Sequence, residues 1–296
     1  MGATNQRMKS FTILHTNDIH GRIEGLARAA TLIGGHSHNL LPNGEWVGRV
    51  LIAQAGQYAE HVGQIDLAWD GDTLNVLRVA CLPVGDDLPP SPIVLAAIEA
   101  QEAEAARFLD QVVGELAQSL DFAEDRECGV ANLMADALRV RLQADVAVVG
   151  AGQAFSGPLP AGPVTRLVLW EVCSSSANPG VATLSGAQLQ AMVHRGLDPG
   201  FAAEQPRTLR GARRGLLHLS GAVVRHGQLW IDGQPVDPSR PYRVAGSDWE
   251  LEPYGGYPEQ EWQFEAVYDT PTILREALEG YLAANRPAVV TMGRLG

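Results

Sequence analysis

Four side chains that could bind a metal lie close together near the start of the chain. Asp18 and His20 form an Asp-x-His pair, and His36 and His38 form a His-x-His pair. In an extended backbone, residues two apart point to the same side, so each pair presents both donors to one point. Oxygen and nitrogen donors of this kind suit Zn²⁺ or Mn²⁺. The spacing predicts a site for one divalent cation. The alternative is that these loop side chains make hydrogen bonds and bind no metal.

The elements that would position these donors are a strand and a helix. Residues 11–16 (FTILHT) have the composition of a strand that ends just before Asp18. Residues 23–33 place apolar side chains along one side at helical spacing, which predicts a helix. Three further strands are predicted at residues 49–55, 62–69 and 73–81. An Asp-Gly-Asp turn between the last two favours a hairpin.

The first part of the chain is therefore predicted to be a small, mostly antiparallel sheet with one helix. Such a sheet must bury an apolar face against something. We expect the C-terminal domain, the helix that follows the sheet or a second copy of the chain to cover this face. A second copy in that place would make the protein a homodimer through its N-terminal sheet.

A proline-rich stretch at residues 83–92 (PVGDDLPPSP) marks the best domain boundary. Apolar side chains then recur at three- and four-residue steps to about Leu120, which predicts a long linker helix. Beyond it, predicted helices and strands alternate, beginning with a helix at residues 131–142 and a strand at residues 145–149, as is typical of an α/β or α+β domain. We therefore predict an N-terminal β-sheet domain at residues 1–85, a linker helix at 86–120 and an α/β domain at 121–296.

The overall charge limits the classes of partner. The chain has 296 residues, 46% of them hydrophobic, and a net charge of −12. This charge argues against nucleic acid or an anionic membrane surface as a partner. One basic run stands out in this acidic chain, and it consists of Arg207, Arg210, Arg213 and Arg214. Most such runs are solvated loops, and the alternative is an anion-binding site.

The cellular compartment is predicted from the number and spacing of cysteines and from the search for targeting segments. The chain has 3 cysteines, which form no C-x-x-C pair and no disulfide framework, so reduced thiols are expected. Neither a signal-peptide core nor an apolar run long enough to span a membrane is recognisable. The chain as given is expected to be cytoplasmic.

Several segments form recognisable blocks along the chain. LHTNDIHGR, GGHSH and AQAGQYAEHVGQIDL lie in the N-terminal part, and ECGVANLMADALR, VATLSGAQLQAMV and DTPTILREALEGYL lie in the second half. In this order they resemble the 5'-nucleotidase family, within the calcineurin-like metallophosphoesterases. The resemblance implies a hydrolase of nucleotide catabolism with two domains. One would be a metallophosphoesterase domain that holds two metals, and the other a C-terminal α/β domain that binds the nucleoside.

The chemistry that the resemblance implies needs a metal pair. Two cations about 3.5–4 Å apart clamp the phosphate oxygens and activate a water, and a bridging carboxylate holds them together. Between Ile33 and Gly34 the family pattern has on the order of 200 residues that this chain lacks, including that bridge. The metal ligands that remain are Asp18, His20, His36 and His38.

The predicted substrate pocket is also incomplete. The resemblance implies that Arg126 contacts an anion and that Tyr257 stacks on a base, against the alternatives of a surface ion pair and a packed aromatic. The family's pocket Asn and Arg fall at Ala151 and Ser156, and its second stacking aromatic falls at Ser175. The loss of each such contact costs roughly 1–3 kcal/mol of binding free energy.

Two functions stay open at this point. The first is weak, metal-dependent hydrolysis of phosphoesters with one divalent cation, Zn²⁺ or Mn²⁺. The second is a non-catalytic protein without a metal that binds a small phosphorylated molecule, a nucleoside or a protein partner. The missing bridge favours the second, because a two-metal mechanism without it should lose most of its rate.

Overall fold

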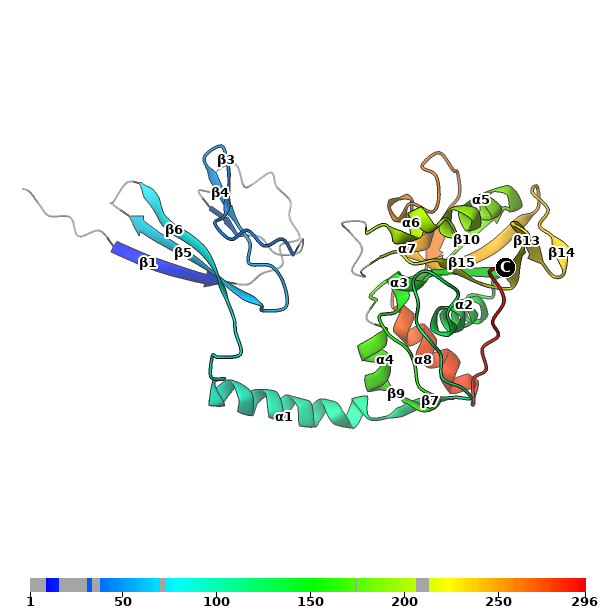
Figure 1. Ribbon diagram of the computed structural model, residues 1–296, viewed down its shortest axis with the longest axis horizontal. Helices are drawn as coiled ribbons and strands as arrows, with labels where there is room; N and C mark the ends of the chain where they lie inside the picture. Colours follow the sequence, from blue (N-terminus) through cyan, green and yellow to red (C-terminus); the bar gives the residue numbers. More distant parts are fainter. Residues whose placement is uncertain (1–8, 16–30, 34–37, 70–72, 174, 206–212) are drawn as a thin grey trace, which may run out of the picture. The chain divides into compact units, whose positions relative to one another are not determined.

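The structure is a computed structural model, and it describes residues 9–15, 31–33, 38–69, 73–173, 175–205 and 213–296 (Figure 1). The chain divides into two compact units, Met1–Ala97 and Ile98–Gly296. Helices and strands are mixed, which confirms the predicted α/β class. In the described part of the chain, no helix is long and apolar enough to cross a membrane.

The first unit contains two three-stranded sheets. One has the order β1-β5-β6 with antiparallel pairs, from β1 (Lys9–His15), β5 (His61–Trp69) and β6 (Leu74–Pro83). The other has the order β2-β4-β3, from β2 (Thr31–Ile33), β4 (Val50–Ala53) and β3 (Glu45–Val47). The predicted pairing of residues 62–69 with residues 73–81 is confirmed.

The predicted helix at residues 23–33 is wrong at its C-terminal end. Thr31–Ile33 forms strand β2, which pairs in parallel with Leu51–Ala53 of β4. The three residues are apolar or β-branched, and a strand partner far along the chain overrides their local helical spacing. Residues 16–30 lie outside the described residues.

The core of the first unit lies between its two sheets. Leu51 and Ala53 alternate along β4, Ile65 and Leu67 alternate along β5, and all four are buried in one cluster. Residues two apart on a strand share a face, so each sheet turns one apolar face toward the other. A cover for the N-terminal sheet therefore exists within the unit itself, which the sequence prediction had not considered.

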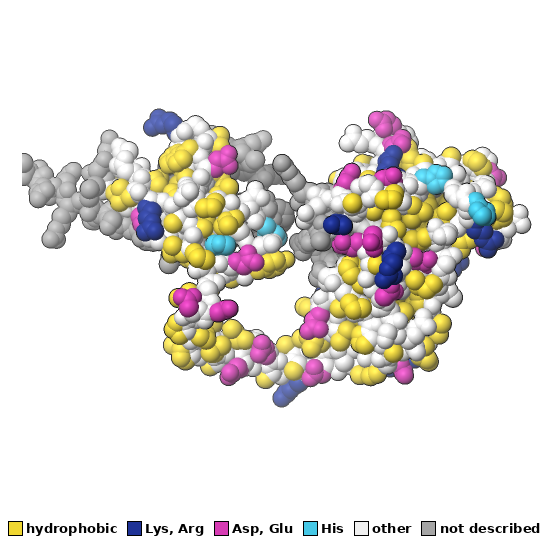
Figure 2. All heavy atoms as spheres, in the orientation of Figure 1, with side chains coloured by type: hydrophobic (Ala, Val, Ile, Leu, Met, Phe, Trp, Pro, Cys, Tyr) yellow, Lys and Arg dark blue, Asp and Glu magenta, His cyan; other side chains and the backbone are white. Residues whose placement is uncertain are grey.

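The predicted linker helix is shorter than expected. Helix α1 spans Pro92–Leu109, and Val112–Leu116 forms strand β7 rather than a helical continuation. Strand β7 pairs antiparallel with β9 (Gly162–Thr165), and Val113 and Leu116 are buried in the core of the second unit. The apolar residues of Val112–Leu116, which fitted the spacing of a helix, thus belong to a strand. No residue of α1 is buried, and Figure 2 shows hydrophobic side chains gathered over its N-terminal half.

The second unit is built around a five-stranded mixed sheet of order β11-β8-β15-β10-β16. Its members are β8 (Val146–Gly150), β10 (Pro179–Ser185), β11 (Leu217–Ser220), β15 (Pro241–Ser247) and β16 (Ala266–Tyr268). The pair β8–β15 is parallel and the other pairs are antiparallel. All five residues of β8 are buried, as expected for a central strand covered on both faces.

Helices cover both faces of this sheet (Figure 1). Ala147 and Val149 of β8 belong to a core with α2 (Gly129–Arg141) and α8 (Leu274–Ala284). Val146 and Val148 belong to a second core with α5 (Gly186–Gly196). Because neighbouring strand residues face opposite sides, one strand supplies both cores, and the unit has three layers.

Shorter elements connect the layers. They are α3 (Ala151–Ala154), α4 (Arg166–Val172), α6 (Pro199–Ala203), α7 (Asp248–Leu251), the 3-10 helix η2 (Pro253–Gly255), and a small sheet of β12 (Ala222–Arg225), β13 (Gln228–Ile231) and β14 (Gln234–Pro235). Gly221 separates β11 from β12 with φ +77°, and a Cβ there would lie 2.2 Å from the Asp145 carbonyl oxygen. A glycine is therefore required where the chain leaves the large sheet.

All three cysteines are free. Cys128, the N-cap of α2, and Cys173, the C-cap of α4, are fully buried in one core, and Cys81 lies on β6, where its Sγ is 3.4 Å from the Leu41 carbonyl oxygen. Burial raises the pKa of Cys173 to about 12. The expectation of reduced structural thiols is consistent with these positions.

Candidate functional site

Of the four predicted metal ligands, only His38 is among the described residues. Asp18, His20 and His36 lie outside the described residues. His38 is exposed, has φ +57°, and its ring centroid lies 6.4 Å from that of Tyr58. Among the described residues, no group of three or more His, Cys, Asp or Glu side chains could hold a metal. The described residues therefore do not fit a metal centre by themselves, and the four-ligand set stays a prediction.

The second unit has a better-defined candidate site, at the edge where the parallel strands β8 and β15 end. A buried carboxyl group, Glu250, joins the two strand ends by accepting hydrogen bonds from Gly150 N–H and Ser247 N–H, both at 2.9 Å. Burial raises the pKa of Glu250, although these donors oppose that shift. Adjacent parallel strands commonly place binding residues at this edge.

Tyr257, the predicted stacking residue, lies against this edge. Its ring is completely buried, and a Cβ at Gly150 would lie 2.7 Å from the Tyr257 hydroxyl. The Phe201 ring meets Tyr257 edge-on, with centroids 5.1 Å apart. The hydroxyl has no hydrogen-bond partner among the described residues, and burial raises its pKa. Tyr257 therefore has no exposed face, and its stacking role stays a prediction.

Arg214 fills the space beside this ring. Its guanidinium carbon lies 4.2 Å from the Phe201 ring centroid, 5.8 Å from that of Trp249 and 5.9 Å from that of Tyr257. It also donates a hydrogen bond to the Gly255 carbonyl oxygen. Only 6% of Arg214 is exposed. The expectation that the basic run is a solvated loop is therefore wrong for Arg214, although Arg213 is exposed.

The backbone holds Arg214 in this place. Arg214 N–H donates to the Glu204 carbonyl oxygen, and its Nε lies 3.3 Å from a Glu204 carboxylate oxygen. Its own carbonyl accepts from Gly152 N–H at 3.0 Å, at the start of α3. A Cβ at Gly152 would lie 2.0 Å from the Arg213 carbonyl oxygen, so the backbone at Arg213 packs directly against α3. We call Arg214 with Phe201, Trp249 and Tyr257 the arginine cage.

Arg126, the predicted anion contact, forms a surface ion pair in this structure. Its Nη1 donates to Asp121, and 61% of the Arg126 side chain is exposed. Burial raises the pKa of Asp121, but hydrogen bonds from Gly129 N–H and Arg126 outweigh it and hold the pKa below its ordinary value. Arg126 does not lie in the arginine cage, and its anion contact stays a prediction.

Of the other predicted pocket positions, Ala151 and Ser175 are buried and Ser156 is exposed. Ala151 is fully buried. Ser156 Oγ donates to the carbonyl oxygens of Glu171 and Val172, at 3.3 and 3.4 Å. Ser175 is buried, and its Oγ accepts from Gln153 Nε2 and from Ala177 N–H. Both hydroxyls therefore bond to the protein, that of Ser156 at the surface and that of Ser175 inside the fold.

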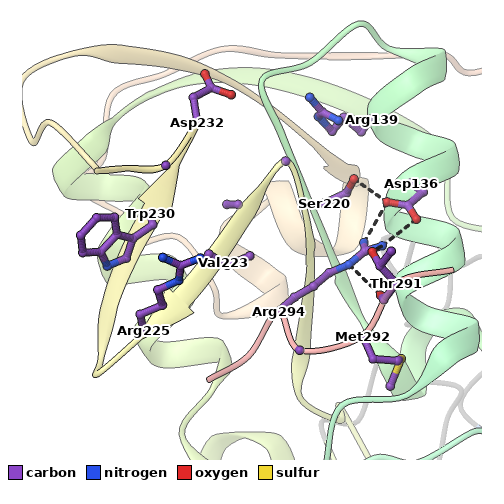
Figure 3. Close-up of a pocket in the computed structure, with 14 residues that line it drawn as sticks. Asp136, Arg139, Ser220, Val223, Arg225, Trp230, Asp232, Thr291, Met292 and Arg294 are labelled. Atoms are coloured by element: carbon purple, nitrogen blue, oxygen red, sulfur yellow. Dashed lines mark hydrogen bonds and ion pairs between the residues drawn. The ribbon is translucent and has the colours of Figure 1, made fainter.

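A second hollow in this unit was not predicted from the sequence. It has a volume of about 420 Å³ and lies between α2, the β12–β13 pair and the segment Thr291–Arg294 (Figure 3). Its charged lining residues are Asp136, Arg139, Arg225, Asp232 and Arg294. We call it the arginine-lined cavity. These residues come from segments far apart in the sequence, so no local pattern brings them together.

Comparison with known proteins places this unit in a family. Residues 112–260 match the family described as 5'-nucleotidase, C-terminal domain. The chain is 28% identical over 245 residues to the uncharacterized metallophosphoesterase YunD of Bacillus subtilis, which covers 76% of this chain and 52% of YunD. It is 25% identical over 178 residues to the endonuclease YhcR of the same organism, covering 58% of this chain and 14% of YhcR.

Solved structures show the same fold. A putative 5'-nucleotidase from Staphylococcus aureus, in complex with alpha-ketoglutarate, is 19% identical with a TM-score of 0.68, and the match covers 92% of this chain and 57% of that one. A 5'-nucleotidase precursor from Thermus thermophilus is 19% identical with a TM-score of 0.54, covering 90% and 58%. This chain thus spans little more than half the length of YunD and of these two proteins. Since the family match runs from β7 past Tyr257 and takes in half of the sequence, the chain belongs to the 5'-nucleotidase C-terminal domain family.

Proposed function

We propose that the chain is a phosphoester hydrolase of the 5'-nucleotidase type whose activity toward nucleotides is weak or lost. The arginine cage carries this proposal. A base can stack only on a ring face that is open, and Tyr257 is fully buried. A planar guanidinium packed over aromatic rings makes the kind of contact that a base would make there. Arg214 would therefore compete with a nucleoside for Tyr257.

The neighbouring positions support the same conclusion. A nucleotide pocket needs polar groups that are free to bind the ligand, because an unpaired buried donor or acceptor costs about 1–3 kcal/mol. Ser156 and Ser175 already bond to the protein, and Arg126 pairs with Asp121. The relative YunD is named a metallophosphoesterase, which supports the same reaction class.

Binding of one divalent metal is part of this proposal. Asp18, His20, His36 and His38 would be its ligands, and one Zn²⁺ or Mn²⁺ would act as a Lewis acid toward the phosphate.

Metal content and turnover test the proposal together. The purified chain is analysed for bound metals and assayed with p-nitrophenyl phosphate and with AMP in the presence of Mn²⁺ or Zn²⁺. We expect slow hydrolysis of the aryl phosphate, slower hydrolysis of AMP, and loss of both in His20→Ala. His226→Asn is the matched control, because His226 is exposed in a turn of the second unit with φ +51°, which asparagine tolerates. If the purified protein contained no metal and showed no turnover, the proposal of a hydrolase would be wrong.

A non-catalytic protein that binds a ligand or a partner is the second candidate. The exposed apolar side chains of α1 favour a protein partner, with Ile93 82% and Val94 55% exposed. A homodimer through the N-terminal sheet is one form of this proposal. Light scattering coupled to size-exclusion chromatography over a range of protein concentrations tests it, and a constant monomer mass would exclude the homodimer.

A further inference from the structure

A small hollow in the second unit lies at α6 and shares no lining residue with the arginine cage. Its volume is about 120 Å³, and its charged lining residues are Glu124, Asp125 and Arg213. A cavity of roughly 150 Å³ holds a molecule the size of benzene, so this hollow has room for a small group but not for a nucleoside. We call it the Glu124 hollow.

The carboxylate of Glu124 is held beside the segment that carries Arg213. The Glu124 carbonyl oxygen accepts a hydrogen bond from Leu216 N–H at 2.8 Å. A Cβ at Gly152 would lie 3.1 Å from Glu124 Oε1 and 2.0 Å from the Arg213 carbonyl oxygen. Both groups therefore lie against the same residue, and the side chains of Glu124 and Arg213 line one hollow.

Glu124 is unusual because its carboxylate has no partner in the protein. It is half-buried, and no hydrogen bond or ion pair to its carboxylate exists in the part of the chain that the structure describes. Every other described carboxylate that is buried or half-buried accepts at least one hydrogen bond. These carboxylates are Asp66, Asp121, Glu127, Asp136, Asp248, Glu250, Glu252, Asp269 and Glu279.

A partly buried carboxylate without a partner is suited to a cationic ligand. Removal from water costs free energy that a charged hydrogen bond to the carboxylate offsets. The protein places no cation on Glu124, although Arg213 lines the same hollow. A ligand that carries a cationic group can therefore supply the missing partner.

The rest of the wall restricts the ligand further. Arg213 is exposed, and its guanidinium is suited to a carboxylate group. The apolar part of the wall comes from Leu197, Pro199, Ala202 and Leu216. The hollow thus offers an acceptor for a cation, a donor for an anion and an apolar surface within one small volume.

We propose that the Glu124 hollow binds a small α-amino acid with a short apolar side chain. Glu124 accepts hydrogen bonds from its ammonium group, Arg213 donates to its carboxylate, and the side chain contacts the apolar wall. An anion without an ammonium group is repelled by Glu124 and Asp125, and an amine without a carboxylate leaves Arg213 unused. Binding at this site is independent of the proposed hydrolysis.

Calorimetric titration of the full chain with L-valine at neutral pH and low ionic strength tests the site, with EDTA present so that no metal-dependent turnover intervenes. Saturable binding at one site is expected, with Kd about tenfold higher in Glu124→Gln and in Arg213→Gln, because each loses a charged hydrogen bond. Glu265→Gln and Arg240→Gln are the matched controls, since both residues are exposed, lie in the same unit and do not line the hollow. Their Kd values should stay within about twofold of that of the unchanged chain.

Three further probes test the chemical class of the ligand. Isobutylamine lacks the carboxylate of valine and isovalerate lacks its ammonium group, so both should bind at least about tenfold more weakly. L-tryptophan should not bind, because its side chain is too large for the hollow. Equal binding of either valine analogue would overturn the assignment to amino acids, and equal binding of tryptophan would overturn the restriction to small ones.

The site itself also has a decisive test. No saturable heat with L-valine, or an unchanged Kd in Glu124→Gln, would show that the Glu124 hollow is not an amino-acid site. Because EDTA is present, this result does not depend on whether the chain hydrolyses phosphoesters.

Discussion

Arg214 shows how a residue from a polar-looking run becomes part of a core. Its guanidinium is surrounded by three aromatic rings and bonds to the Gly255 carbonyl oxygen. A buried cation is stable only when it is paired and hydrogen-bonded. Glu204 and the aromatic faces supply that environment.

Replacement of Arg214 by alanine should open the arginine cage. The variant loses a charged hydrogen bond and a cation–π contact, so its free energy of unfolding is expected to fall by about 2–4 kcal/mol. The vacated space is lined by Phe201, Trp249 and Tyr257, so adenosine should bind more tightly to the variant than to the unchanged chain. Urea unfolding and calorimetry with adenosine measure the two effects.

Arg213→Ala is the control for this change, because Arg213 is the exposed neighbour of Arg214. It removes the same charge from the same segment and should alter neither quantity appreciably. Adenosine binding that is identical in Arg214→Ala and in the unchanged chain would show that Arg214 does not close the pocket.

His218 should make stability depend on pH. It is buried, its Nε2 accepts from Cys128 N–H at 2.8 Å, and its Nδ1–H donates to the Leu216 carbonyl oxygen at 2.9 Å. Burial lowers its pKa to about 4, from an ordinary value of about 6.5. The unfolded chain therefore takes up a proton that the folded chain does not, and stability is complete above pH 6.5 and falls between about pH 6.5 and pH 4.

The expected loss over that window is on the order of 3 kcal/mol. Urea unfolding at a series of pH values measures it. In His218→Gln the free energy of unfolding should change less between pH 6.5 and pH 4 than in the unchanged chain. In His226→Asn, at an exposed turn, it should change as much as in the unchanged chain. An unchanged slope in His218→Gln would assign the pH dependence to other groups.

The sequence located single residues only where a family block or a sharp spacing marked them. Tyr257 was found through a block, but its complete burial depends on Phe201 and Arg214, which lie elsewhere in the sequence. Arg214 was misjudged because a basic run normally indicates solvation, and only the tertiary fold brings three aromatic rings around it. Arg139, Arg225 and Arg294 meet at one cavity from distant segments, so no local pattern could have predicted that site.

At the level of elements, the ion pair between Arg294 and Asp136 joins the C-terminal segment Thr291–Arg294 to α2. Arg294 and Asp136 have side-chain exposures of 9% and 17%. Arg294→Ala leaves the Asp136 carboxylate largely buried without its counter-ion, and the free energy of unfolding should fall by about 3 kcal/mol or more.

Urea unfolding checks this value. The double variant Asp136→Asn with Arg294→Gln removes both charges and should recover part of the loss, because no uncompensated charge remains buried. Additive losses in the double variant would show that the two side chains act independently and would contradict the proposed fastening.

Periodic elements were predicted well and short tertiary ones were not. The helical period of residues 131–142 and the apolar run of residues 145–149 correspond to α2 and β8, because their burial imposes a regular pattern. Thr31–Ile33 and Val112–Leu116 were assigned to helices, and both became strands through partners elsewhere in the chain. Spacing alone does not reveal a strand whose partner is distant.

At the level of the whole molecule, the division into two units falls within α1, a helix without a buried residue. Exposed connections are preferred sites of proteolysis. Trypsin is expected to cleave early after Arg107 and to release a stable fragment that begins at Phe108 and keeps the complete family match. Mass spectrometry of a time course identifies the fragment, and Arg107→Gln should suppress it. Survival of the intact chain while other sites are cut would contradict an accessible α1.

The placement of the three thiols gives each unit its own chemical reporter. Cys81 belongs to the first unit, whereas Cys128 and Cys173 are buried in the second. A thiolate is the reactive form, and burial suppresses it. In native buffer a maleimide should label Cys81 first. As the denaturant concentration rises, labelling of Cys128 and Cys173 should begin only when the second unit unfolds. Peptide mapping of the labelled cysteines would therefore show at which denaturant concentration each unit unfolds, without any substitution in the chain.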